Sequence, residues 1–248
     1  MVLSMDRWVG KVAIVTGASS GIGAAIAEQL VEQGLKVAGL ARRKDRLEEL
    51  AKKLTGKKGK LYPVVTDISK EEDILKAFAW IKENLGPVHI LINNAGVARR
   101  GSLLQETENF ETVFKVNVLG LCIATREAIK DMKANNVDGH IVHINSVVGH
   151  QAMAGSTVYP ASKFAVTALA ETLRLELNSL KSKIKITSLS PGLVESEFNR
   201  PEWDKAQLLK EGKMIKPEDI ADGVVYVLST PPHVQIQEIT IRTILDPF

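Results

Sequence analysis

Hydrophobic and polar positions follow two periods along the chain, and these alternate from one end to the other. Short apolar runs predict buried strands, and segments with apolar positions three or four residues apart predict helices. The expected strands are 12–15, 37–40, 61–65, 88–92, 140–144, 184–189 and 235–241. The expected helices are 21–33, 44–54, 70–84, 103–134, 157–180 and 217–228. This alternation is typical of βαβ units, in which helices cover both faces of a parallel sheet.

Two sequence signals indicate where helices begin. Ser69-Lys70-Glu71-Glu72 has the pattern of a capping box, which predicts that the Ser69 side chain caps the third helix. Pro217 opens the last helix in the first turn, where proline is tolerated. The chain has no linker, internal repeat or low-complexity stretch, so we expect one domain over 1–248. Within it, the segment 195–216 is the expected cover of a substrate pocket.

Composition narrows the class of protein. The 248 residues are 45% hydrophobic and 25% charged, as in soluble globular proteins. No apolar run is long enough to span a bilayer, and the first ten residues lack the apolar block of a signal peptide. The single Cys122 lies in an apolar run, so it reads as core packing and fits a reducing compartment. We expect a cytoplasmic protein, and the scattered histidines predict no metal site.

The net charge of +3 conceals an uneven distribution. The window 42–60 holds nine basic and three acidic residues, which is +6, so the rest of the chain carries −3. Nucleic-acid binding would need basic residues over a whole face, and the sequence does not support it. The window indicates either a local anionic target or a solvated basic helix.

A glycine-rich loop of the form G-x-x-x-G-x-G follows the first expected strand. Gly17 permits a tight turn, Gly21 lets the backbone approach a pyrophosphate, and Gly23 lets the helix pack closely on the strand. The helix N-terminus supplies free N–H groups for phosphate, and Ser19 and Ser20 add hydroxyl donors. Such a loop can be an ordinary turn, but its place at the first strand-to-helix junction predicts dinucleotide binding.

The residues after the second and third strands bear on which dinucleotide is bound. An acidic residue after the second strand would favour NAD, but Arg42 and Arg43 stand there and can pair with a 2′-phosphate. The alternative is that both arginines are solvated residues at a helix start. We expect NADP(H). Because Ser69 is the expected cap of the next helix, Asp67 is left free to bind the adenine amine; the alternative is that Asp67 is an ordinary turn residue.

Tyr159 and Lys163 are four residues apart and share one helix face. With Thr157 as N-cap, Pro160 lies in the first turn and interrupts no helical bond. An unperturbed tyrosine has a pKa of about 10, and a nearby cation lowers it, so the phenol can act as a general acid or base. Ser146 follows the fifth strand, where its hydroxyl can hold a substrate oxygen. Taken alone, the Tyr–Lys spacing occurs often by chance, and an exposed surface pair is its default interpretation. Ser146 taken alone is as easily a turn or cap serine.

Two asparagine positions complete the candidate chemistry. Asn117 interrupts an apolar helical stretch, and a buried asparagine needs partners in the backbone or in water. Asn93-Asn94-Ala95-Gly96 follows the fourth strand and could simply close a loop.

Taken together and in this order, these motifs resemble the short-chain dehydrogenase/reductase family over essentially the whole chain. The resemblance implies a single-domain α/β fold, a Rossmann-type doubly wound seven-stranded parallel sheet. It implies that Tyr159 is the acid/base, that Lys163 binds the nicotinamide ribose, that Ser146 orients the substrate and that Asn117 holds a water. The implied cofactor-binding residues are Gly17, Ser19, Ser20, Gly21, Ile22, Gly23, Arg42, Arg43, Asp67, Ile68, Asn94, Ala95, Gly96, Tyr159, Lys163, Pro191, Gly192, Val194 and Ser196. Ser196 departs from the family, which more often has threonine there.

A narrower resemblance is to insect NADP-dependent farnesol dehydrogenases and related vertebrate keto-steroid reductases. It rests on 5–8, 40–43, 139–146 and 216–220. It implies a lipophilic alcohol, aldehyde or ketone as substrate, with an isoprenoid alcohol favoured and a keto-steroid or retinoid as the alternative. The expected substrate contacts are Ser146, Val148, Tyr159, Phe198 and Trp203. A catalytically silent nucleotide-binding regulator is the third reading. The family also implies a homodimer or homotetramer through helices 103–134 and 157–180.

Overall fold

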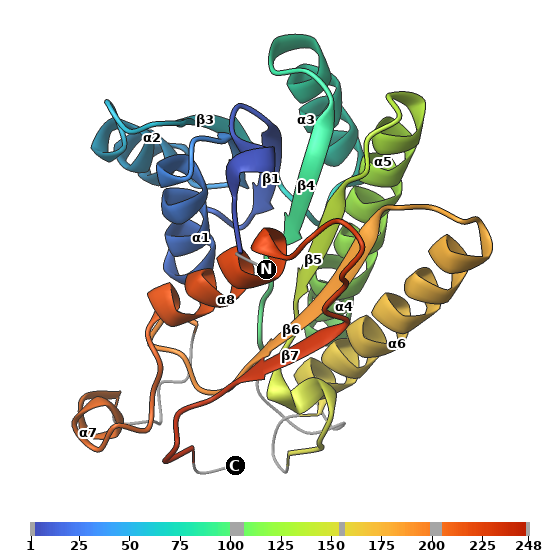
Figure 1. Ribbon diagram of the computed structural model, residues 1–248. Helices are drawn as coiled ribbons and strands as arrows, with labels where there is room; N and C mark the ends of the chain where they lie inside the picture. The colour runs from blue at the N-terminus through green and yellow to red at the C-terminus, as the bar shows by residue number, and fades with distance from the viewer. Residues whose placement is uncertain (1–2, 100–106, 154–156, 199–204, 247–248) are drawn as a thin grey trace.

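The computed structural model describes residues 3–99, 107–153, 157–198 and 205–246. Its centre is a seven-stranded parallel sheet in the order β3-β2-β1-β4-β5-β6-β7 (Figure 1). The strands are β1 (Val12–Thr16), β2 (Lys36–Ala41), β3 (Lys60–Val65), β4 (Val88–Asn93), β5 (His140–Ile144), β6 (Lys185–Pro191) and β7 (Glu238–Ile241). The strand order reverses between β1 and β4, and ligands bind at the carboxyl ends beside such a switch point. The predicted single-domain Rossmann-type fold is confirmed.

Two layers of helices cover the sheet (Figure 1). The helices are α1 (Gly21–Glu32), α2 (Lys44–Lys53), α3 (Glu71–Asn84), α4 (Thr107–Phe114), α5 (Leu121–Ala134), α6 (Val158–Ser179), α7 (Lys205–Lys210) and α8 (Pro217–Ser229). Short 3-10 turns occupy Asp6–Trp8 (η1) and Val147–Gly149 (η3), and a π turn occupies Lys115–Gly120 (η2). Residues of α1, α2 and α8 pack on one face of the sheet, and residues of α3, α5 and α6 pack on the other.

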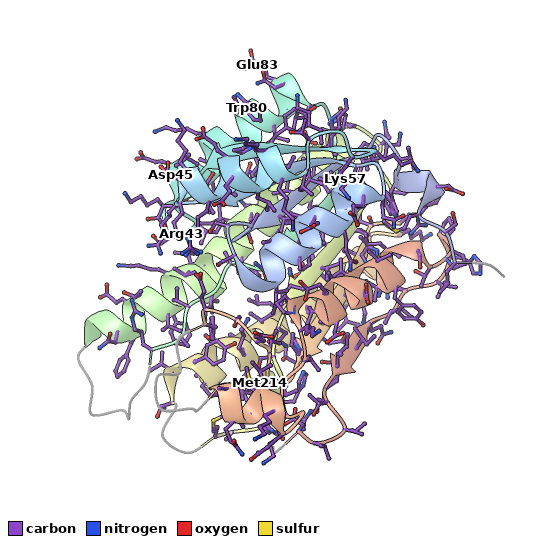
Figure 2. The ribbon with its side chains drawn as sticks, turned by 90° about the vertical axis from the view of Figure 1, so that its left-hand side faces the viewer. Arg43, Asp45, Lys57, Trp80, Glu83 and Met214 are labelled. Atoms are coloured by element: carbon purple, nitrogen blue, oxygen red, sulfur yellow. The ribbon has the colours of Figure 1, made fainter. Side chains whose placement is uncertain are left out.

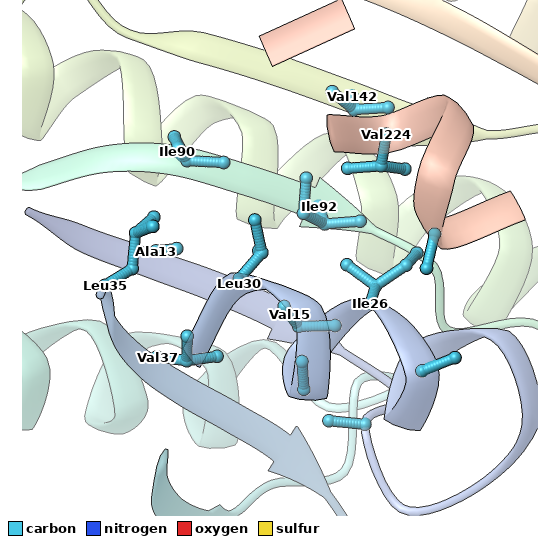
Figure 3. Packing of buried hydrophobic residues seen from close by; sticks show 14 of the residues in the cluster. Ala13, Val15, Ile26, Leu30, Leu35, Val37, Ile90, Ile92, Val142 and Val224 are labelled. Carbon is cyan, nitrogen blue, oxygen red and sulfur yellow. The ribbon is translucent and has the colours of Figure 1, made fainter. Parts of the chain in front are cut away.

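The central strands are apolar on both faces because both faces are buried. Every residue of β1 is buried, as expected for an inner parallel strand. On the α1 face, Ile26 and Leu30 lie over Val15 and Ile92, and Val224 of α8 closes the cluster (Figure 3). This packing fixes the start of α1 against the end of β1, where the glycine loop lies.

The capping-box prediction is wrong. The backbone N–H and the hydroxyl of Ser69 both donate to Asp67 Oδ1, at 3.0 and 2.7 Å. The N-cap of α3 is Lys70, which makes no side-chain capping bond. Ser69 prefers the carboxylate two residues before it because this local bond competes with the cap. The second helix start is confirmed: Pro217 is the first residue of α8.

The long helical region expected over 103–134 is confirmed in its described part, 107–134, but it contains a π turn. Helix α4 ends at Phe114, the π turn follows, and α5 begins at Leu121. The segment expected as a cover is also structured in part. Val194 pairs with Ile215 in an isolated parallel bridge, and α7 lies between them in sequence, apart from the helix layers (Figure 1). No helix among the described residues is long and apolar enough to cross a membrane.

Candidate active site

A cavity of about 540 Å³ runs along the carboxyl ends of the central strands. Every residue predicted to bind the cofactor lines it, as do the predicted substrate contacts Ser146, Tyr159 and Phe198. Val148 and Asn117 do not line the cavity but lie behind its wall. Trp203 falls outside the described residues. Residues that follow six strands, β1 to β6, thus meet in one place because parallel strands bring their carboxyl ends to one edge of the sheet.

The side chain of Asn94 fixes the conformation of the glycine loop. Gly17 has φ +70°, a left-handed conformation that favours glycine, and a Cβ there would lie 2.9 Å from Ala95 Cα. Asn94 Nδ2 donates to the carbonyl oxygens of Thr16 and Gly17, at 2.9 and 3.3 Å. A Cβ on Gly23 would overlap Asn94 Nδ2 and the Gly17 oxygen. Asn94 therefore does more than close its own loop, because its side chain connects the end of β4 to the glycine loop by hydrogen bonds.

The start of α1 has the donors that a pyrophosphate needs. The first N–H groups of a helix have no intrahelical acceptor, and Ser20 at the N-cap makes no side-chain capping bond. Only glycine at position 23 lets the start of α1 lie this close to the glycine loop, because a Cβ there would overlap Asn94 Nδ2 and the Gly17 oxygen. The residues present therefore fit a dinucleotide.

Arg43 contacts both the glycine loop and a distant carboxylate. Its Nη2 donates to the hydroxyls of Ser19 and Ser20, at 2.9 and 2.6 Å. Its Nη1 lies 2.9 Å from Glu197 Oε2, and Arg46 Nη1 lies 2.6 Å from Glu197 Oε1. These bonds from Arg46 and Arg43 lower the pKa of the Glu197 carboxyl. Figure 2 shows Arg43 at the start of α2 and Met214 well separated from it; both line the cavity.

The tertiary structure brings a carboxylate to the place after the second strand where the sequence has Arg42 and Arg43. Glu197 belongs to the connection between β6 and α7, far from these arginines in sequence. Arg46 was also missed as a site residue. Its spacing of three from Arg43 on a helix is the signal that could have found it.

The capping prediction left the Asp67 carboxylate free to bind the adenine amine. In the structure this carboxylate already has hydrogen-bond partners. Its Oδ1 accepts two bonds from Ser69, and its backbone N–H donates to Asp73 Oδ2 at 3.1 Å. Burial alone would raise the pKa of the Asp67 carboxyl. The bonds from Ser69, with the charge of Arg42, outweigh burial and lower it.

Tyr159 and Lys163 lie at the other end of the cavity, in the first turns of α6. Both are buried, at 7% and 6% exposure, so they are not an exposed surface pair. Lys163 Nζ donates to the Ile144 carbonyl at 2.8 Å and lies 5.7 Å from the centroid of the Tyr159 ring. Burial lowers the pKa of Lys163 to about 8. Ser146 Oγ, at the end of β5, accepts a bond from the Val148 N–H at 3.3 Å.

Asn117 braces the cavity wall from within the π turn. Its Oδ1 accepts from the Val97 N–H at 2.8 Å, and its Nδ2 donates to the Val97 carbonyl at 2.9 Å. The same Nδ2 lies 3.0 Å from Ser162 Oγ, which donates to the Tyr159 carbonyl at 2.7 Å. Backbone groups or water were the expected hydrogen-bond partners of Asn117, and the structure shows the backbone groups. Ser162 was missed, although it lies inside the Tyr-x-x-x-Lys motif.

Apolar side chains pack around Tyr159. Val147, Val148 and Tyr159 form a buried cluster with Met153 and Phe198 packed against it. The Phe198 ring lies 5.4 Å from the Tyr159 ring, centroid to centroid, at a tilt of 57°. A phenol beside an apolar wall suits a ligand whose oxygen is attached to a hydrocarbon.

Two further observations concern metal-ligand groups and the single cysteine. Within the ranges that the structure describes, no three His, Cys, Asp or Glu side chains are grouped to hold a metal ion. Burial raises the pKa of the Cys122 thiol, which disfavours the nucleophilic thiolate.

The comparisons with known proteins point the same way. The family model described as short chain dehydrogenase matches residues 11–207. The chain is 49% identical over 251 residues to a farnesol dehydrogenase of Aedes aegypti, covering 98% of this chain and all of that protein. It is 49% identical over 249 residues to dehydrogenase/reductase SDR family member 11 of Homo sapiens, covering 96% of each.

Two solved structures of the same fold contain NADP+ or 5-hydroxy-NADP. A closed form of serine dehydrogenase complexed with NADP+ has a TM-score of 0.85 and 31% identity, over 96% of each chain. An alcohol dehydrogenase of Thermococcus sibiricus complexed with 5-hydroxy-NADP has a TM-score of 0.84 and 29% identity, over 94% of this chain and 97% of that one. The chain belongs to the short-chain dehydrogenase/reductase family and is an oxidoreductase.

Proposed function

We propose that this protein is an NADP(H)-dependent oxidoreductase that interconverts a lipophilic alcohol and its aldehyde or ketone. An isoprenoid alcohol such as farnesol is the favoured substrate. The observation that carries the proposal is the buried Tyr159–Lys163 pair at the apolar end of a cavity whose other end holds Arg43. The 49% identity to a farnesol dehydrogenase supports the choice of isoprenoid.

The chain's own residues would hold the cofactor at three places. The glycine loop and the start of α1 would hold the pyrophosphate, and Arg42 and Arg43 the 2′-phosphate. Lys163 would hold the nicotinamide ribose, and the segment 191–196 would lie against the nicotinamide. NADP(H), when bound, supplies or accepts the hydride.

Tyr159 would move the proton that accompanies the hydride. Its hydroxyl gives a proton to the carbonyl oxygen in reduction and takes one from the alcohol in oxidation. The Lys163 ammonium stabilises the phenolate, and the Ser146 hydroxyl orients the substrate oxygen. Asn117 would position this pair through Ser162 and Val97. The water-holding role expected for Asn117 stays a prediction.

Replacing Tyr159 by phenylalanine tests the mechanism. The ring and its contact with Phe198 remain, but the transferable proton is lost, so kcat should fall by about 10²- to 10⁴-fold. NADPH binding, followed by fluorescence titration, should change little by comparison. Unchanged turnover in Tyr159→Phe would refute the acid/base role.

A panel assay tests the substrate class. Farnesol, geraniol, retinol and keto-steroids would be compared by kcat/KM, each with NADP(H) and NAD(H). We expect the isoprenoid alcohols to rank first and NADP(H) to be preferred. A keto-steroid or retinol in first place would favour the alternative substrate, and tight NADPH binding with no turnover of any compound would favour the silent regulator.

We also propose that the protein is cytoplasmic and forms a homodimer or homotetramer. Apolar side chains on the proposed contact helices support the oligomer: Phe164 and Leu175 of α6 are 45% and 53% exposed, and Leu119 of the π turn is 52% exposed. Cell fractionation would test the location.

A further inference from the structure

Two consecutive residues of the β6–α7 connection reach different parts of the cavity. The Glu197 carboxylate bonds to Arg43 and Arg46 at the end where the glycine loop lies. The Phe198 ring packs on Tyr159 at the end where proton transfer is proposed. Both residues line the cavity.

The Glu197 carboxylate uses the donors that a 2′-phosphate would use. A guanidinium pairs in the same forked way with a carboxylate and with a phosphate. Arg46 Nη1 bonds to both Glu197 oxygens, at 2.6 and 2.7 Å, and Arg43 adds a third bond at 2.9 Å. A phosphate brought to Arg43 would meet this negative charge, so the two anions would compete.

The ion pairs are of a kind that a ligand can exchange. The side chains of Arg43, Arg46 and Glu197 are 44%, 45% and 56% exposed. Exposed pairs are weak and screened by salt. The bonds from Arg43 to Ser19 and Ser20 do not depend on Glu197, so the guanidinium keeps a place on the glycine loop without it.

We propose that Glu197 is a cofactor-specificity residue, whose carboxylate competes with the 2′-phosphate of NADP(H) for Arg43 and Arg46. The inference rests on the proposed use of NADP(H). Glu197 lowers the affinity for the phosphorylated nucleotide and so narrows the preference for NADP(H) over NAD(H).

Nucleotide binding without turnover tests this proposal. Adenosine 2′,5′-bisphosphate carries the 2′-phosphate and 5′-AMP lacks it, and neither has a nicotinamide. Isothermal titration would give the Kd of both for wild type, Glu197→Gln, Glu195→Gln and Arg43→Gln. Glu195→Gln is the matched control, because Glu195 lies two residues away with the same charge and does not line the cavity.

The expected result is selective. Glu197→Gln should bind the bisphosphate about two- to fivefold more tightly than wild type at low salt, with 5′-AMP unchanged and the gain smaller at high salt. Glu195→Gln should match wild type. A Kd for the bisphosphate that is unchanged or weaker in Glu197→Gln would overturn the competition, and an equal gain for both nucleotides would reduce it to general charge.

Failure of the cofactor proposal has a different signature. If NADP(H) is the cofactor, wild type prefers the bisphosphate to 5′-AMP, and Arg43→Gln loses that preference by about tenfold or more. No preference in wild type would overturn both proposals. A wild-type preference that Glu197→Gln leaves unchanged would overturn only the role of Glu197.

Discussion

Lys163 shows how one residue joins stability to chemistry. Its ammonium is buried and donates to the Ile144 carbonyl, and burial lowers its pKa to about 8. Keeping a charge in that place costs folding free energy. The same placement puts the Lys163 ammonium 5.7 Å from the centroid of the Tyr159 ring, where it would stabilise the phenolate of the proposed mechanism. The proposed function therefore needs a buried charge that lowers the stability of the fold.

The pH dependence of stability measures this cost. Below about pH 8 Lys163 is charged in both states, and the full cost is present. Between about pH 8 and 10.5 the unfolded chain keeps the proton that the folded chain releases, so the free energy of unfolding rises with pH, by on the order of 3 kcal/mol. Lys163→Met should lack this rise.

Urea unfolding at several pH values checks the prediction, as the difference between wild type and Lys163→Met. Lys36→Met is the control, because Lys36 is exposed at the start of β2. A difference that stays constant across the interval would mean that Lys163 is not charged and buried as described.

At the scale of elements, the π turn and the glycine loop carry the site. A π turn adds a residue to a helical turn, and such turns occur often at functional sites. Here it contains Asn117, whose amide binds both backbone groups of Val97. The hydrophobic period over 103–134 predicted a helix but could not show the extra residue, because apolar spacing does not record which hydrogen bonds the backbone makes.

Gly23→Ala tests the close packing of α1 on the loop. The added methyl group would overlap Asn94 Nδ2 and the Gly17 oxygen, and the backbone has to move. We expect a loss of stability of about 1–3 kcal/mol, as for an overpacked core, together with weaker NADPH binding. Denaturant midpoints and fluorescence titration would measure both.

Gly96→Ala is the control for stability. A Cβ there comes no closer than 3.6 Å to Asn117 Oδ1, which is an ordinary contact. Its midpoint should stay near that of wild type. If Gly23→Ala is as stable as Gly96→Ala, the brace by Asn94 is looser than the geometry indicates.

At the scale of the whole molecule, helix α6 covers the sheet and exposes some of its apolar side chains to solvent. Phe164 and Leu175 are too exposed to serve the core of one chain. We therefore expect wild type to sediment as a dimer or tetramer that dissociates on dilution, and the double variant Phe164→Glu, Leu175→Glu to sediment as smaller species.

Ile244→Glu is the matched change for this experiment, because Ile244 is fully exposed and lies outside both helices. It should leave the assembly intact. A wild-type protein that sediments as a monomer at every concentration would contradict the proposal.

The sequence by itself determined the strands and helices, the glycine loop and the Tyr159–Lys163 spacing. These are local features, because burial on a sheet or helix repeats with a fixed period and a turn such as that at Gly17 demands its residue type. The motifs, taken in order, were also enough to indicate the family and the cavity's lining.

The tertiary structure decided how distant side chains meet. It brought Glu197 into contact with Arg43, which lies 154 positions away in the sequence. It also paired the Ser69 hydroxyl with the Asp67 carboxylate, where a capping box was expected. Exposed charges and short polar side chains have several partners of similar energy, and none of these leaves a period in the sequence. Which partner is taken depends on where the folded backbone places the loops.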